Sequence, residues 1–249
     1  MKSFSISFSA PSLTIPISYH HQVQGLIYSI VRRGGGEALH DVSLDFGLRQ
    51  YKLFTFSSLR GGKADSRRKS LCFGRAAYLD VRSVRPEFCD ALTAGLNSGF
   101  GFDLFGQSLA VRSVNISDAV ITESRLGLKM LSPLTVHRTG EGGRTDYLTP
   151  LDPGFAEEIN KNFARKFYAF TGQKPSADIV IKAKTVGIKD KYVTLYKREA
   201  NSEKKDIYIT GWRGEYELYG RPEYLNFLYY SGLGARNSDG FGMFEPWSL

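Results

Sequence analysis

Three side chains near the N-terminus are spaced so that they could act together as acid, base and charge stabiliser. His40 follows a run of three glycines, Tyr28 lies twelve residues before it, and Lys52 lies twelve residues after it. An imidazole titrates near neutral pH and suits general acid or base catalysis. A lysine ammonium stabilises charge on a phosphorane, and a tyrosine can orient the imidazole or bind the phosphate. Such a set can cut RNA, whose 2′-hydroxyl is the nucleophile. From the spacing alone, a partly exposed loop residue is the default interpretation of His40.

A glycine-rich segment near the C-terminus, GLGARNSDGFG, has a pattern suited to phosphate. Its glycines and the polar residues between them are Gly232, Gly234, Arg236, Asn237, Ser238, Gly240 and Gly242. Glycines let backbone amides approach a ligand closely or adopt positive φ, and the arginine adds a fixed positive charge. The segment is neither a P-loop nor a dinucleotide fingerprint, because no Lys-Ser or Lys-Thr follows and a strand comes after it. A turn that lets two sheets pack is an equally good interpretation of the pattern.

A second candidate RNA-binding segment is strongly basic. It reads RGGKADSRRK and holds five basic residues against Asp65: Arg60, Lys63, Arg67, Arg68 and Lys69. We expect it to form a loop between two strands. Such a run is usually a solvated loop, and the alternative is a flexible arm that binds phosphates.

The histidines and carboxylates form no pattern typical of a metal site. His20 and His21 are adjacent, and on a helix they point about 100° apart. Asp146 and Asp152 have no acidic cluster around them, whereas two-metal nucleases need several convergent carboxylates. We therefore expect no metal and no other cofactor.

The composition favours a globular protein with a polyanionic partner. The 249 residues carry 33 Lys and Arg against 25 Asp and Glu, a formal charge of +8. No apolar run is long enough to span a bilayer, so no membrane association is expected. Cys72 and Cys89 are too few for a zinc knuckle or a disulfide framework, and reduced cysteines fit a cytoplasmic protein.

The elements that must position these residues follow the same order twice. The first half is predicted to contain strands at 2–8, 51–59, 71–81 and 108–122 and helices at 20–33 and 86–96. The second is predicted to contain strands at 126–136, 178–186, 192–197, 207–219 and 241–247 and helices at 155–170 and 222–230. Apart from one extra strand, each half has the β-α-β-β-α-β order of a ferredoxin-like domain. We therefore expect an α+β protein with two tandem ferredoxin-like, RNA-recognition-motif-like domains and antiparallel sheets. Residues 1–124 would carry the catalytic residues, and residues 125–249 the glycine-rich loop.

Several stretches together resemble a known family. They are YHHQVQGLIY at residues 19–28, LHD at 39–41, KLFTFS at 52–57, the break Ser132-Pro133-Leu134 and the loop GLGARNSDGFG. In these the chain resembles the CRISPR-associated repeat-cleaving endoribonucleases of the repeat-associated RNA-binding superfamily. The glycine-rich loop marks the superfamily, and its combination with the other stretches is more specific.

This resemblance implies a substrate and roles for residues. The substrate would be the repeat RNA of a CRISPR transcript, cut without metal to leave a 2′,3′-cyclic phosphate and a 5′-hydroxyl. His40 would be the general acid or base, Lys52 the charge stabiliser and Tyr28 a supporting group. The protein would be a monomer or homodimer, and membership of a multisubunit CRISPR effector complex is a further expected association.

Two alternatives remain open. The first is a non-cutting RNA-binding subunit of a CRISPR effector complex, built on the same fold. The second is a general RNA-recognition module, in which Phe54 and Phe56 would stack on bases. Burial of both rings in the core is the interpretation that we favour for this pair.

Overall fold

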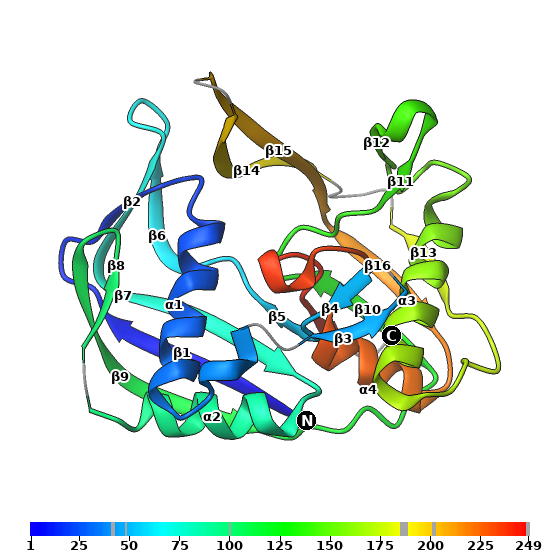
Figure 1. Cartoon of the computed structure of the whole chain (residues 1–249), viewed down its shortest axis with the longest axis horizontal. Coiled ribbons are helices and arrows are strands. Elements are labelled where there is room, and N and C mark those ends of the chain that lie inside the picture. Colours follow the sequence, from blue (N-terminus) through cyan, green and yellow to red (C-terminus); the bar gives the residue numbers. More distant parts are fainter. Residues whose placement is uncertain (41–42, 48, 100, 185–188, 201–202, 248–249) are drawn as a thin grey trace. The chain divides into compact units, whose positions relative to one another are not determined.

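The computed structural model of the chain describes residues 1–40, 43–47, 49–99, 101–184, 189–200 and 203–247. Of His40, only the backbone is described. The chain forms two compact units (Figure 1). Unit 1 comprises Met1–Val42, Ser58–Asp118 and Val193–Ile209. Unit 2 comprises Ser43–Ser57, Ala119–Tyr192 and Thr210–Leu249.

The sheet of unit 1 is antiparallel. Its strands are β1 (Lys2–Ser9), β2 (Thr14–Pro16), β6 (Arg60–Asp65), β7 (Ser70–Ser83), β8 (Phe102–Leu104) and β9 (Gln107–Ser117). Strand β7 pairs with β6 and β1, and β1 pairs in turn with β9. The spatial order β6-β7-β1-β9 places the first strand of the motif between the third and the fourth. Short strands β2 and β8 extend this sheet along β7 and β9.

Two helices of unit 1 pack closely against each other. They are α1 (His20–Arg33) and α2 (Pro86–Leu96), and the 3-10 helix η1 (Glu37–His40) follows α1 (Figure 1). The apolar face of α1, which includes Val23, Ile27 and Ile30, is fully buried. A Cβ atom on Gly34 would overlap the carbonyl oxygen of Ala91 in α2. The glycine that ends α1 therefore also permits this close approach.

The sheet of unit 2 repeats the topology of unit 1. Its strands are β10 (Arg125–Met130), β13 (Val180–Ala183), β16 (Glu215–Tyr219) and β17 (Phe244–Trp247), all antiparallel in the order β13-β16-β10-β17. This is again the second, third, first and fourth strand of a β-α-β-β-α-β motif. The predicted fold of two ferredoxin-like domains with antiparallel sheets is confirmed.

The helices of unit 2 carry an aromatic cluster. They are α3 (Phe155–Thr171) and α4 (Pro222–Ser231). Phe163 and Phe167 of α3 lie 5.2 Å and 5.1 Å, centroid to centroid, from the ring of Tyr224 in α4, and Phe227 lies within 6.2 Å of both. These contacts fix α3 relative to α4, which ends directly before the glycine-rich loop.

The remaining elements are short or form hairpins. They are β3 (Leu44–Phe46), β4 (Arg49–Tyr51), β5 (Phe54–Phe56), β11 (His137–Thr139), η2 (Glu141–Gly143), β12 (Thr145–Tyr147), β14 (Lys189–Ala200), β15 (Glu203–Arg213) and η3 (Asn237–Asp239). Strand β3 packs on α3. The hydroxyl of Thr55 in β5 donates to the carbonyl of Phe241, 3.1 Å away. Segment 43–57 is thus an integral part of unit 2.

The predicted helices have the observed bounds to within one residue, whereas several predicted strands differ from those observed. The single strand predicted over residues 207–219 is two strands, β15 and β16, and the strand predicted over residues 126–136 ends at Met130. The continuous strand predicted over residues 51–59 is interrupted, because Leu53 has a φ of 53° and β5 begins after it. The loop predicted for the basic segment is largely the strand β6. Strand β6 is mostly exposed and lacks the apolar alternation that marks a half-buried strand. The predicted domain boundary after residue 124 stays a prediction; the long segment of unit 2 begins at Ala119.

Candidate nucleic-acid interface

The glycine-rich loop connects α4 to β17 and is held by its own backbone. The amide of Leu233 donates to the carbonyl of Gly242, and the amide of Gly242 donates to the carbonyl of Pro133, each at a distance of 2.9 Å. The amide of Ala235 donates to the carbonyl of Thr135 at a distance of 3.0 Å. All four glycines of the loop, and Arg236 as well, have positive φ. The loop is therefore an ordered turn anchored on the segment after β10.

Two of the glycines are required by packing inside unit 2. A Cβ atom on Gly234, whose φ is +64°, would lie 2.5 Å from the carbonyl oxygen of Thr135. A Cβ atom on Gly242 would overlap the carbonyl oxygen of Leu233. Packing of the loop against the backbone of Thr135 and Leu233 is therefore enough to require these two glycines, whether or not a ligand is bound.

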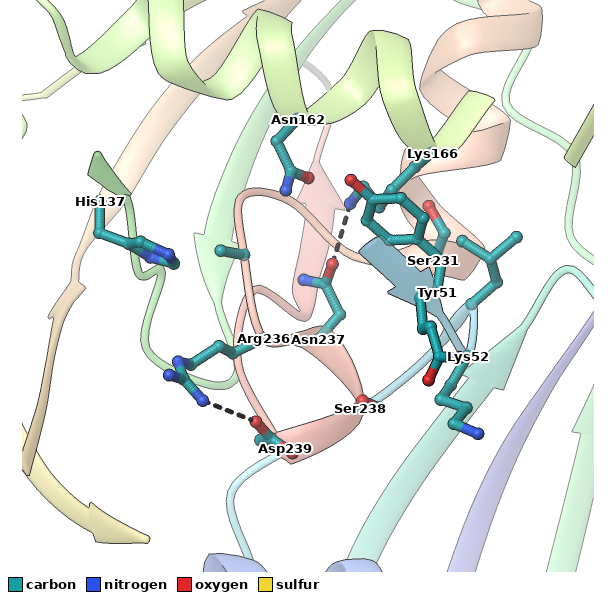
Figure 2. A pocket seen from close by; sticks show the side chains of 13 residues that line it. Tyr51, Lys52, His137, Asn162, Lys166, Ser231, Arg236, Asn237, Ser238 and Asp239 are labelled. Atoms are coloured by element: carbon teal, nitrogen blue, oxygen red, sulfur yellow. Dashed lines mark hydrogen bonds and ion pairs between the residues drawn. The ribbon is translucent and has the colours of Figure 1, made fainter. Parts of the chain in front are cut away.

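A buried lysine, absent from the sequence-based predictions, organises the loop from α3. The ammonium of Lys166 donates to Oδ1 of Asn237 at 2.9 Å (Figure 2). It also donates to the carbonyl oxygens of Gly232 at 2.6 Å and Gly234 at 3.3 Å. The side-chain nitrogen of Asn237 in turn donates to the carbonyls of Leu233 and Phe241. Burial lowers the pKa of Lys166 from its ordinary 10.5 to about 7. The side chains of Lys166 and Asn237 therefore hold the loop together, and the Asn237 side-chain amide makes its hydrogen bonds within the loop.

A cavity of about 420 Å³ lies beside the loop. Segment 43–57, helices α3 and α4, strand β11 and the loop all contribute to its wall. Its lining consists of Gln50, Tyr51, Lys52, Leu53, His137, Asn162, Lys166, Ser231, Ala235, Arg236, Asn237, Ser238 and Asp239. The structure therefore brings Lys52 together with the predicted RNA-binding residues Arg236, Asn237 and Ser238. The reason is the turn at Leu53, which buries Phe54 and Phe56 beside the loop and leaves Lys52 at the cavity.

Arg236 lies at this cavity in a left-handed conformation. Its guanidinium is 3.4 Å from the carboxylate of Asp239 (Figure 2). The side chain of Arg236 is 36% exposed. The positive charge of Arg236 partly offsets the burial that raises the pKa of Tyr147. The arginine is thus held by one carboxylate, and a third of its side chain is accessible.

Tyr28 lies in a different place, on α1 of unit 1. It is buried, and it lines a groove of about 190 Å³ together with His21, Gln24, Gly25, Ser29 and Arg32. The backbone of His40 ends η1, which packs on α1, while the side chain of His40 lies outside the described parts of the chain. Tyr28 and His40 belong to unit 1 and Lys52 to unit 2, so the three catalytic roles stay predictions.

The basic segment is ordered by its own contacts. Arg60 forms an ion pair of 2.7 Å with Asp80, whose side chain is only 7% exposed. Asp65 accepts hydrogen bonds from the amides of Arg67 and Arg68, an Asx-type turn that closes the β6–β7 hairpin. Lys63 lies within β6, and Lys69 ends the turn with a φ of 48°. The segment comprises one strand and the tip of a charged hairpin, and its role in RNA binding stays a prediction.

Sequence reasoning missed the residues of α3 and α4 that line the cavity. Lys166 lies between Phe163 and Phe167 on the apolar face of α3, and a single lysine on such a stripe was a detectable signal. Asn162 and Ser231 gave no signal, because polar residues on helices are ordinarily solvent-facing. Among the described residues, no group of three or more His, Cys, Asp or Glu side chains is placed to hold a metal. No helix in the described ranges is long and apolar enough to cross a membrane.

Comparisons with known proteins show which family and which fold the chain resembles. Residues 116–246 match the family model described as CRISPR associated protein Cas6, C-terminal. The chain is 26% identical over 236 residues to CRISPR-associated endoribonuclease Cas6 1 of Methanocaldococcus jannaschii, covering 92% of this chain and 86% of that one. It is 24% identical over 234 residues to CRISPR-associated endoribonuclease Cas6 of Pyrococcus furiosus, covering 92% and 82%. A solved structure described as a RAMP protein binding different RNA substrates has a TM-score of 0.79 at 19% identity, covers 100% of both chains, and shares the fold.

Proposed function

The chain belongs to the CRISPR-associated protein Cas6 family, and we propose that it is an endoribonuclease that cuts CRISPR repeat RNA in precursor transcripts to give guide RNAs. The observation that carries this proposal is the family match over more than half of the chain, which includes the glycine-rich loop and its supporting helices. Both curated relatives that cover nine-tenths of the chain carry the same activity in their names.

The proposed reaction needs no metal ion. The 2′-hydroxyl upstream of the scissile phosphate loses its proton to a base, and its oxygen forms a bond to phosphorus. The bond from phosphorus to the 5′-oxygen breaks, and an acid protonates that oxygen. The products are a 2′,3′-cyclic phosphate and a 5′-hydroxyl. Proton transfer suits His40, and the charge on the phosphorane suits Lys52.

The structure supports different parts of this proposal unequally. Lys52 lines the cavity of the glycine-rich loop, where it can contact a phosphate of RNA bound there. Tyr28 lines a groove on α1 and would support His40 from unit 1. The loop would position the RNA through Arg236, Ser238 and its backbone, and the hairpin of the basic segment would add phosphate contacts at its tip.

Single-turnover cleavage of a repeat-containing transcript tests the proposal. We expect His40→Ala to slow cleavage by about 10²- to 10⁴-fold with little change in RNA affinity. Cleavage should persist in excess EDTA and stop when the ribose before the scissile phosphate is deoxyribose. A His40→Ala rate equal to wild type would remove His40 from the mechanism. Inhibition by EDTA would point to metal-activated water.

The same assay distinguishes the enzyme from a non-cutting subunit. A wild-type protein that binds the repeat tightly and leaves it intact would be an RNA-binding component of an effector complex. Membership of such a complex, the monomeric or homodimeric state and a cytoplasmic location stay predictions. Co-purification and light scattering measure the first two.

A further inference from the structure

Lys52 lies in a short link whose backbone conformation is unusual. It follows β4 and is separated from β5 by Leu53 alone. Leu53 is buried and has a φ of 53°, a left-handed conformation that leucine rarely adopts. Such a conformation persists only where the surrounding structure fixes it, and residues of this kind cluster at functional sites. The position of Lys52 therefore depends on what holds β5, directly after this link.

Thr55 at the centre of β5 is hydrogen-bonded to the glycine-rich loop. Its side chain is fully buried, and its hydroxyl donates to the carbonyl of Phe241, 3.1 Å away. The same carbonyl accepts a hydrogen bond from the side-chain amide of Asn237 at 3.0 Å, and Asn237 Oδ1 accepts one from Lys166 at 2.9 Å. A continuous chain of hydrogen bonds thus runs from α3 through the loop to β5, and it ends three residues from Lys52.

The hydroxyl of Thr55 is not needed to satisfy the loop. The side-chain amide of Asn237 already pairs with the carbonyl of Phe241, and one partner is enough for a buried carbonyl. A valine would fill the same space in a buried strand and bring no polar group that needs a partner. What the threonine adds is a directional bond between β5 and the loop. That bond restrains the position of β5, and with it the position of Lys52.

The loop lies between two cations that the proposed reaction uses. Lys52 and Arg236 line the same cavity from opposite sides of the loop (Figure 2). The conformation of the loop therefore sets the separation between the RNA contact predicted at Arg236 and the ammonium predicted to stabilise the phosphorane. Reaction rates depend steeply on such distances, and a misplacement of about 1 Å can cost about 10²-fold.

We propose that Thr55 is a positioning residue that ties Lys52 to the glycine-rich loop, so that the loop that positions the RNA also places the ammonium at the scissile phosphate. The inference rests on the proposed function and on the role of Lys52 in it. Thr55 is fully buried and acts through Lys52 alone. Loss of its hydroxyl should therefore slow the cutting step and leave RNA binding intact.

Thr55→Val tests this inference, because it removes the hydroxyl and keeps the β-branched shape. In single-turnover cleavage of a repeat-containing transcript at saturating enzyme, its rate should fall by about ten-fold or more. Binding isotherms should show little change in RNA affinity, since the loop and Arg236 stay in place. Thr55→Ser, which keeps the hydroxyl, should cut at nearly the wild-type rate. Thr55→Ala repeats the loss of the hydroxyl with a smaller side chain and covers the case in which valine does not fit.

Thr135→Val is the matched control for lost stability. Thr135 is also fully buried in unit 2, and its hydroxyl donates to the carbonyl of Thr210 at 2.7 Å. The substitution leaves the backbone carbonyl of Thr135 in place beside the loop. Both valine variants should lower the melting temperature by similar amounts, and only Thr55→Val should slow cleavage.

A double substitution distinguishes positioning from general destabilisation. Lys52→Ala combined with Thr55→Val should cut no more slowly than Lys52→Ala alone, because Thr55 acts only through Lys52. Additive losses, or a Thr135→Val rate as low as that of Thr55→Val, would overturn the positioning role. Wild-type cleavage by Thr55→Val, with slow cleavage by His40→Ala, would also overturn it and leave the proposed function standing. If the wild-type protein cuts no repeat RNA, or Lys52→Ala cuts as fast as wild type, the role of Lys52 falls and that of Thr55 falls with it.

Discussion

Replacing Lys166 with methionine should loosen the glycine-rich loop while changing the free energy of unfolding of the protein only modestly. Three buried oxygens lose their donor: those of Gly232, Gly234 and the Asn237 side chain. At about 1–3 kcal/mol for each unsatisfied buried group, the loss amounts to about 3–9 kcal/mol. Methionine also removes the cost of burying an ammonium. The lowering of the Lys166 pKa from 10.5 to about 7 corresponds to about 5 kcal/mol. The two contributions have opposite signs, so the net change is smaller than either.

Amide hydrogen exchange measures the local effect directly. The amides of Leu233, Ala235 and Gly242 donate within unit 2 and should be protected in the wild type. In Lys166→Met we expect these amides to exchange about ten-fold faster or more, because the oxygens that the ammonium held no longer have their donor. Lys161→Met is the control, because Lys161 is on the same helix, is 45% exposed and pairs only with Glu157 and Glu158 among the described ion pairs. Equal protection of the loop in the wild type and both variants would refute the holding role of Lys166.

Three further predictions concern pH, salt and one helix. The folded state releases the Lys166 proton near pH 7 and the unfolded state near 10.5, so the unfolded state holds more protons between these values. The free energy of unfolding should therefore rise with pH in this window, by up to about 5 kcal/mol. Urea titrations at several pH values should show this rise in the wild type and not in Lys166→Met. The same pH dependence of the free energy of unfolding in both proteins would contradict the prediction. Arg236→Ala removes the guanidinium and keeps a Cβ at the same φ of 57°. It should lower RNA affinity and reduce the salt dependence of binding by about one phosphate contact, measured by binding isotherms at several salt concentrations. An unchanged salt slope would count against a phosphate contact. Gly25→Ala should raise the free energy of unfolding by about 0.5–1 kcal/mol, because a Cβ there meets nothing within 4 Å, and should slow cleavage if RNA enters the Tyr28 groove; loss of stability in thermal melts would contradict the first part.

The fold could be predicted where apolar periodicity and helix-stop signals coincide. Val23, Ile27 and Ile30 mark α1, and the glycines after Arg33 end it. Pro86 and Pro222 start their helices at the residues expected. Prediction failed where a strand carries no apolar alternation, as in β6, or where one residue with positive φ interrupts a strand, as Leu53 does. Neither feature follows from local composition, since long-range pairing with β7 and burial beside the loop determine them.

The candidate site was only partly predictable for a similar reason. Lys52 and Arg236 were found as isolated chemical signals, and the cavity that joins them depends on segment 43–57 packing on unit 2. Thr55 acquires its significance only through its buried hydrogen bond to Phe241, 186 residues further along the chain. No sequence pattern reports such a contact, because the pattern is the same for a solvated threonine and a shielded one.

The glycine-rich loop shows why a motif can identify a fold without identifying a reaction. Gly234 and Gly242 have no space for a side chain beside the carbonyls of Thr135 and Leu233, whether or not RNA is present. A non-cutting protein with the same turn would need the same two glycines. Gly234→Val would consequently disrupt the turn itself and could not separate RNA binding from packing. Lys52 and Arg236 line the cavity without any such requirement from the backbone. Substitutions at these two positions, and at His40, are therefore the ones that can distinguish an RNA-cutting member of the family from a protein that only shares its shape.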